Sequence, residues 1–244
     1  MIRTGKRPIL YLAKGDVTVY LLRGSEGDLL IDTGFLGTWH TLSEWISQYD
    51  VRYVFLTHGH PDHDWNAARL QKRGAKILLC EKDRGLPRHF LSQPVRATMP
   101  RYRVRNLVQR FGGALTNSPR YTPDILLNGA PAALRSLGFD AEIIPLPGHT
   151  YGSLGILAGG VLCCGDAFTM LWKKPDITPH AVSPELMTES LRTILRLSPE
   201  WLACGHGLPV RMKEAAPVIS DYLRSAGKAA QTSAGSRLSE ESNK

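Results

Sequence analysis

The stretch "VRYVFLTHGHPDHDW", residues 51–65, joins an apolar run to a dense cluster of polar side chains. It begins as a short apolar run with β-branched and aromatic residues, typical of a buried β-strand. Three histidines and two aspartates then follow around a glycine and a proline. Polar side chains next to a buried strand destabilise a fold unless they have partners. We interpret the cluster as a set of metal ligands.

The spacing of the polar residues supports this interpretation. His58 and His60 are two positions apart where the strand ends, so their rings can point the same way. The glycine between them lets the backbone bend, and the proline after them brings Asp62 and His63 to the start of a helix. Imidazole and carboxylate ligands suit zinc, iron or manganese better than calcium or magnesium. For Asp62 alone, a capping or turn role is the simpler alternative.

The pattern around the motif predicts strands that alternate with helices. Apolar runs indicate strands at 17–23, 28–34, 51–57, 75–80, 141–146, 153–159, 161–166 and 201–205. Helical spacing indicates helices at 38–49, 64–74, 184–197 and 212–227. Two strand-rich halves, each followed by helices, predict two packed sheets with helices outside them.

The motif H-x-H-x-D-H after an apolar strand resembles the metallo-β-lactamase superfamily. That family's pattern continues with a histidine, an aspartate and a histidine, each at a strand end, and His149, Asp166 and His206 occupy such positions. Asp32 matches the family's early aspartate. The resemblance covers about residues 17–210 and implies an α/β fold, a four-layer αββα sandwich of two mixed β-sheets flanked by helices. We expect one hydrolase domain over 1–227.

The resemblance also implies a role for each ligand. It assigns one ion to His58, His60 and His149, the other to Asp62, His63 and His206, and the bridging position to Asp166. The implied cofactors are two divalent metal ions, with zinc as the first choice and iron or manganese as alternatives. Asp32 either orients a ligating histidine or only forms a turn, and both explanations stay open.

Two metal ions close together can present a bridging hydroxide at neutral pH. We expect it to attack an ester, thioester or lactone carbonyl of a small, anionic acyl substrate, as in glyoxalase II-like hydrolases. Asp62 and Asp166 are the expected catalytic carboxylates, with Asp62 passing a proton to the leaving group. The sequence contains no G-x-S-x-G motif that would indicate a serine hydrolase. Thr169 stands where lactonases of the family often have tyrosine, which weakens that assignment.

The positive charge of the chain is concentrated in one segment. The formal net charge is +8, and residues 84–123 contain eight arginines and no acidic residue. We expect this segment to be an insertion or lid that contacts an anionic substrate. The alternative is an amphipathic cover with solvated arginines and its apolar side chains inward, namely Tyr102, Val104, Leu107, Val108 and Phe111.

The same arginines keep two other functions open. A phosphodiesterase or nuclease of the same fold would use them on phosphates. Nucleic acid is nevertheless the less favoured partner, because the aromatic residues of the segment are irregularly spaced. The third alternative is an enzyme similar to the mononuclear iron persulfide dioxygenases.

The composition also excludes several classes. No apolar run approaches the ~20 residues of a membrane span, and no secretion signal is recognisable, so we expect a cytoplasmic protein. The four cysteines show no C-x-x-C spacing and are expected to be reduced thiols. The polar tail 228–244 is expected to be disordered or loosely attached.

For four further polar residues, the simplest expectation is a structural role or exposure to solvent. Asp64 is expected to cap the helix that follows the motif. His40 lies in a predicted helix with tryptophans and has no assigned chemistry. His89 and His180 lie in proline-bearing loops, where exposure is expected and a substrate contact is the minor alternative.

Overall fold

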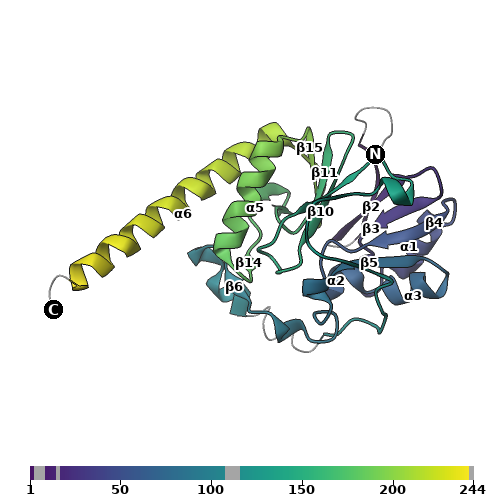
Figure 1. Cartoon of the computed structure of the whole chain (residues 1–244), viewed down its shortest axis with the longest axis horizontal. Helices are drawn as coiled ribbons and strands as arrows, with labels where there is room; N and C mark the ends of the chain where they lie inside the picture. The colour runs from purple at the N-terminus through teal and green to yellow at the C-terminus, as the bar shows by residue number, and fades with distance from the viewer. Residues whose placement is uncertain (3–8, 15–16, 108–115, 242–244) are drawn as a thin grey trace.

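The computed structural model describes residues 1–2, 9–14, 17–107 and 116–241, with side chains up to residue 227. Two six-stranded sheets form its centre, and helices cover their outer faces (Figure 1). The first sheet has the order β1-β2-β3-β4-β5-β7 and the second β16-β15-β11-β10-β9-β8. Both sheets are mixed, so the expected αββα sandwich is confirmed.

The first sheet starts with antiparallel strands and continues with parallel ones. Its strands are β1 (Leu10–Lys14), β2 (Val17–Arg23), β3 (Asp28–Ile31), β4 (Val51–Phe55), β5 (Lys76–Cys80) and β7 (Ile125–Leu127). The strands β2 and β3 form the predicted hairpin, and β3, β4, β5 and β7 pair in parallel. Three helices accompany this sheet: α1 (Trp39–Ile46), α2 (Pro61–Asp64) and α3 (Ala67–Lys72). The helix predicted at 64–74 is thus divided between the end of α2 and α3.

The second sheet contains the later strands. They are β8 (Ala132–Ala133), β9 (Glu142–Pro145), β10 (Leu154–Ala158), β11 (Val161–Gly165), β15 (Trp201–Cys204) and β16 (Val210–Arg211). β11 and β15 are parallel, while β9, β10 and β11 are successively antiparallel. The carboxyl ends of β9, β11 and β15 therefore lie at the same edge of the sheet.

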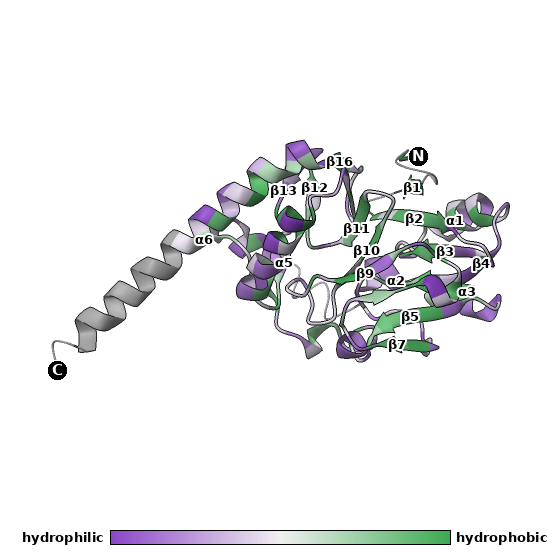
Figure 2. Cartoon of the chain, turned by 45° about the horizontal axis from the view of Figure 1, so that its top comes forward, coloured by the Kyte–Doolittle hydropathy of each residue, from purple (hydrophilic) through white to green (hydrophobic). Residues whose placement is uncertain are grey.

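Three apolar cores separate the four layers, and the strands of both sheets are largely hydrophobic (Figure 2). Side chains alternate between the faces of a strand, so Leu29 and Ile31 of β3 pack between the sheets while Leu30 packs towards the helices. The same core contains Ile156 and Cys163 from the inner face of the second sheet. The next residue, Cys164, lies on the other face of the strand and packs into the core between this sheet and the outer helices. All four cysteines are buried and free.

The helices over the second sheet are α5 (Pro184–Leu197) and α6 (Met212–Glu241). α5 has the predicted bounds, because Ser183 caps it by accepting a hydrogen bond from the Leu186 backbone N–H and Pro184 fits its first turn. α6 tolerates Pro217 and is longer than the predicted 212–227 helix. Its backbone continues into the expected tail, whose loose attachment stays a prediction. No helix in the described part of the chain is long and apolar enough to cross a membrane.

Part of the arginine-rich segment 84–123 lies outside the described residues, including Val108 and Phe111. The short helix η1 (Glu81–Asp83) precedes the segment. Its described part contains the short helices η2 (Phe90–Ser92) and η3 (Pro100–Tyr102) and the strand β6 (Arg96–Ala97), and its residues 103–107 are helical. β6 pairs with β14 (His180–Ala181). The inward orientation proposed for Val104 and Leu107 is wrong, since they are 77% and 54% exposed. The pairing of β6 with β14 and the buried side chain of Tyr102 attach the segment to the rest of the domain.

Candidate metal centre

The loops that follow β4, β9, β11 and β15 meet at one end of the sandwich. They carry His58 and His60, His149, Asp166 and His206, respectively, while α2 carries Asp62 and His63. The carboxyl ends of parallel strands lie at the same edge of a sheet, so residues far apart in sequence converge there. All seven predicted ligands are brought together in three overlapping groups, in each of which the ligand atoms lie within 4.8 Å of one another.

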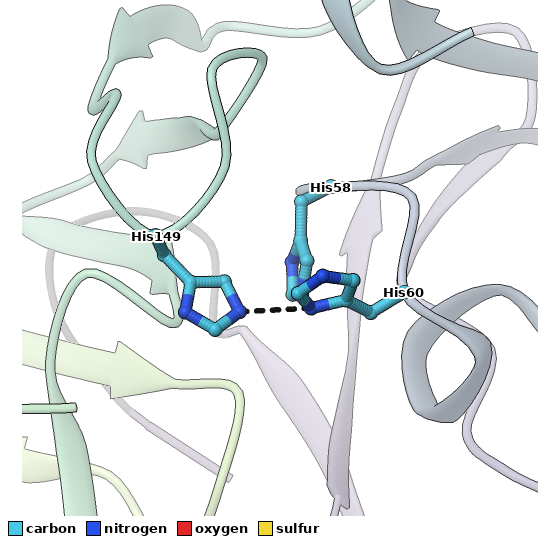
Figure 3. A group of neighbouring side chains, drawn as sticks. All are labelled: His58, His60 and His149. Carbon is cyan, nitrogen blue, oxygen red and sulfur yellow. Dashed lines mark hydrogen bonds between the residues drawn. The ribbon is translucent and has the colours of Figure 1, made fainter. Parts of the chain in front are cut away.

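The first group is His58, His60 and His149, which approach from two different loops (Figure 3). His149 Nδ1 donates to the backbone carbonyl of His180 at 3.0 Å, which leaves its Nε2 as the free lone pair. That Nε2 lies 2.9 Å from His60 Nδ1. Two of the three rings, His60 and His149, therefore face each other through ring nitrogens.

The second group is Asp62, His63 and His206, and the third, of His58, His63 and Asp166, shares one histidine with each of the other two. His206 Nε2 lies 3.3 Å from Asp62 Oδ2 and 3.3 Å from Asp166 Oδ2. Asp166 also lies 3.5 Å from His63 Nε2 through Oδ1 and 3.5 Å from His149 Nε2 through Oδ2. One carboxylate thus faces histidines of both groups.

Asp32 fixes the orientation of His63 from behind. Its Oδ2 accepts a hydrogen bond of 2.8 Å from His63 Nδ1, so Nε2 of that ring is directed towards the carboxylates of the cluster. The Asp32 backbone has a φ of +60°, which is uncommon for a residue with a side chain. The backbone N–H and hydroxyl of Thr57 both donate to its carboxylate. Asp32 is therefore a buried hydrogen-bond acceptor and does more than form a turn.

The cluster fits a metal ion because several of its donor atoms are otherwise unsatisfied. His58 Nε2, His63 Nε2 and Asp166 Oδ1 are buried, and none of the described residues hydrogen-bonds to them. Buried polar atoms of this kind are destabilising unless something binds them. Nitrogen and carboxylate oxygen donors without a thiolate match an open transition-metal site.

The electrostatics of the first group favour neutral rings. Burial lowers the pKa of His58 and of His60 well below the usual range, and neighbouring imidazoles lower it further. Burial also lowers the pKa of His149, against the opposing effect of Asp166. A neutral imidazole has a lone pair to offer, so these rings are in the form that binds metal.

In the second group and at Asp166, the electrostatics favour the charged forms of both the histidines and the aspartates. Burial disfavours the charged form of His63, but Asp32 and Asp166 outweigh it and raise the pKa to about 9. Burial is likewise outweighed at His206, whose pKa Asp166 raises well above the usual range. Burial would raise the pKa of Asp62 and of Asp166, yet the neighbouring histidines hold both pKa values below the usual range. This part of the cluster attracts positive charge, which a metal ion can supply in place of the ring protons.

A cleft of about 980 Å³ opens onto the second group and includes Asp62, Asp166 and His206 in its lining. Its outer part contains the cationic side chains Lys14, Arg105 and Lys173. Apolar side chains line it as well, among them Phe35, Leu36, Phe90 and Trp172. The cleft therefore combines a metal-binding floor with a positively charged and apolar rim.

Sequence reasoning missed the role of Asp83. This carboxylate is buried and accepts four hydrogen bonds, from the backbone of Gly59 and Gly152 and the side chains of Gln93 and Thr150. It joins the loop of His58 and His60 to the loop of His149. The only signal in the sequence was an acidic residue soon after a strand, which is too common to be informative.

The capping role expected for Asp64 and the exposure expected for His180 were both wrong. Asp64 does not cap a helix; its buried carboxylate accepts hydrogen bonds from Ser118 and Tyr121 of the arginine-rich segment. His180 is buried beside His149, with ring centroids 4.6 Å apart, and burial lowers its pKa to about 3. His89 is exposed as expected, and His40 is exposed too.

A mixed αββα sandwich with a histidine and aspartate cluster at one end defines a class of metal-dependent hydrolases. The model of the Metallo-beta-lactamase superfamily matches residues 12–206. The chain belongs to that family.

Individual proteins resemble this chain at moderate or low sequence identity. Hydroxyacylglutathione hydrolase GloC of Haemophilus influenzae is 36% identical over 132 residues, which are 52% of this chain and 54% of that relative, so the match spans about half of its length. The metallo-beta-lactamase family protein TTHA1429 of Thermus thermophilus superposes with a TM-score of 0.64 at 20% identity, over 91% of this chain and 79% of that one. TTHA1623, solved in a di-iron-bound form, gives 0.58 at 23% identity, over 86% and 97%.

Proposed function

We propose that the chain is a dinuclear metal-dependent hydrolase of small anionic thioesters, similar to hydroxyacylglutathione hydrolases, with esters and lactones as related substrates. The observation that carries the proposal is the convergence of six ligand-type side chains around the carboxylate of Asp166 at a cationic cleft. The partial match to hydroxyacylglutathione hydrolase GloC supports the thioester class.

The ligand sets follow the arrangement of the side chains. His58, His60 and His149 would hold one ion, Asp62, His63 and His206 the other, and Asp166 would contact both. Bound divalent ions would lower the pKa of a water molecule towards neutrality and withdraw charge from the attacked carbonyl. Zinc, iron and manganese all suit these donors, and the di-iron form of TTHA1623 keeps iron among the candidates.

The protein's own groups would position the reactants and move the proton. Asp62 is the partly exposed carboxylate of the cluster and lines the cleft, so it is placed to receive a proton and pass it to the leaving group. Asp166 is nearly fully buried, which suits a positioning role. The cationic rim would bind the negative charge of the substrate before the reaction.

A panel of three substrates tests the proposal: an acyl-glutathione thioester, an acyl-homoserine lactone and a phosphodiester, each with the metal-loaded protein. Asp166→Ala serves as the inactive control and Asp140→Asn, which is exposed, as the matched control. We expect thioester turnover that Asp166→Ala abolishes. Cleavage of the phosphodiester alone would overturn the acyl hydrolase and favour the phosphodiesterase alternative, for which the cationic rim is the supporting observation.

A further inference from the structure

A two-residue hairpin turn with an unusual sequence lines the cleft. The strands β12 (Thr169–Leu171) and β13 (Lys174–Asp176) pair with Leu171 opposite Lys174, so Trp172 and Lys173 form the turn. Both have positive φ values, +48° and +65°. Asparagine and glycine are the usual residues in such turns, and positive φ is unfavourable for a bulky side chain. Backbone strain of this kind is concentrated at functional sites.

The strained turn places the indole of Trp172 in the lining of the cleft. Trp172 is 78% exposed, yet it lines the same cleft as Asp62 and Asp166. Leu36 is also exposed and lines the cleft. When a ligand covers a large apolar side chain in a cleft, the burial of that surface favours binding. These two side chains therefore favour a ligand with an apolar or aromatic part.

Cationic groups accompany the indole. The Arg105 guanidinium lies 6.0 Å from the centroid of the Trp172 ring, within reach of a cation–π contact. Lys173 follows Trp172 in the turn, and Lys14 lines the cleft as well. The acidic residues of the described lining are Asp62 and Asp166, which belong to the metal centre. A ligand that covers the indole thus meets positive charge and lies beside the metal-binding floor.

The hairpin and the segment of Arg105 are fixed to each other. The Tyr102 hydroxyl donates to Asp176 Oδ2 at 2.5 Å, and Arg101 donates to Asp176 Oδ1 at 2.7 Å. Just beyond β13, the Thr98 hydroxyl donates to the Thr178 carbonyl at 2.6 Å. The two backbone segments that carry Trp172 and Arg105 are therefore joined before a ligand binds, which reduces the entropy lost on binding.

We propose that Trp172, Lys173 and Arg105 form a subsite that anchors the non-reacting part of an organic anion, with an aromatic or alkyl face on the indole and the negative group beside the two cations. The proposal rests on the proposed function, since it names the substrate class of the same cleft. Binding energy from a remote part of a substrate that is equal in the ground and transition states changes KM and leaves kcat unchanged.

Equilibrium binding to the metal-loaded protein tests the subsite without any turnover. Naphthalene-2-sulfonate combines the aromatic face and the charge, 2-naphthol lacks the sulfonate, and methanesulfonate lacks the rings. We expect calorimetry to show the tightest binding for naphthalene-2-sulfonate. Trp172→Ala and Arg105→Ala should each weaken it about three- to tenfold. Val104→Ala and Arg103→Ala are matched controls, because both residues are exposed in the same segment but do not line the cleft.

Each outcome decides one proposal separately. Failure of naphthalene-2-sulfonate to bind, or equal affinity in Trp172→Ala and the wild type, overturns the subsite even if thioesters are hydrolysed. Loss of all hydrolysis in the substrate panel overturns the proposed function and leaves the binding result standing. Where a thioester is turned over, Trp172→Ala should raise KM about three- to tenfold at unchanged kcat. A fall in kcat alone would contradict the anchoring role.

Discussion

Thr150 Oγ1 donates a hydrogen bond of 2.7 Å to Asp83 Oδ2, the same carboxylate oxygen that accepts from the Gly59 backbone N–H at 3.3 Å. Gly59 lies between His58 and His60, and Thr150 follows His149. One buried carboxylate therefore sets the distance between the two loops that carry the first ligand group. Asp83 and Asp32 are not themselves candidate ligands, but each contacts a loop or ring that carries one.

Asp83→Asn should weaken metal binding about 10- to 100-fold while the protein stays folded. The amide keeps the shape of the side chain, but its NH₂ group cannot accept the hydrogen bonds that one carboxylate oxygen now receives. Competition with a chromogenic chelator measures the change. Glu81→Gln, an exposed substitution two residues earlier, is the matched control. An unchanged metal affinity in Asp83→Asn would show that the loops are held in place without this carboxylate.

Asp32→Asn should reduce the bound metal from two ions to about one. The carboxylate accepts the Nδ1 proton of His63, and the amide holds that tautomer less firmly, so the second ligand group loses a well-oriented nitrogen. Metal analysis after dialysis gives the stoichiometry. Asp50→Asn changes an exposed aspartate near the same sheet and should keep both ions. Two ions in Asp32→Asn, bound with wild-type affinity, would contradict this role.

Gly205→Ala should disrupt the centre by crowding it. A Cβ at this position would contact Asp166 Oδ1 and would lie 2.6 Å from His63 Cε1. Both atoms belong to side chains held in a close-packed site, so the overpacking should destabilise the protein by about 1–3 kcal/mol and lower its metal content. Gly85→Ala is the control, because nothing lies within 4 Å of a Cβ there. Urea unfolding and metal analysis check both variants, and equal results for the two would show that the site can expand.

Removal of metal should lower the thermal stability of the protein. Ions that bind only the folded state at about 1,000 times their dissociation constant add about 4 kcal/mol to the free energy of unfolding. Thermal unfolding with a chelator, and then with excess zinc, measures this difference as a shift in Tm. His58→Ala should reduce the response, and His40→Ala should keep it, because His40 lies on an exposed helix face. A chelator-insensitive Tm in the wild type would argue against the metal centre.

Much of the architecture was predictable because its signals are local. Strand and helix periodicities placed β2, β4, β10 and α5 within a residue or two of their bounds. The short strands β12, β13 and β14 were missed, since two or three residues carry no clear periodicity. The inward orientation of Val104 and Leu107 failed for a different reason. Backbone pairing and Tyr102 attach that segment, so a helical apolar stripe was not required.

The candidate ligands and their order along the chain could be named before the fold was known. His58, His60, Asp62 and His63 are neighbours in the chain, and the resemblance to the family's pattern selects His149, Asp166 and His206, each of which follows an apolar strand. The residues that support these ligands could be identified only from the folded structure. Asp83 and His180 contact partners that come from distant parts of the chain. Such contacts arise when separate strands and loops pack together, and no local propensity or spacing encodes them.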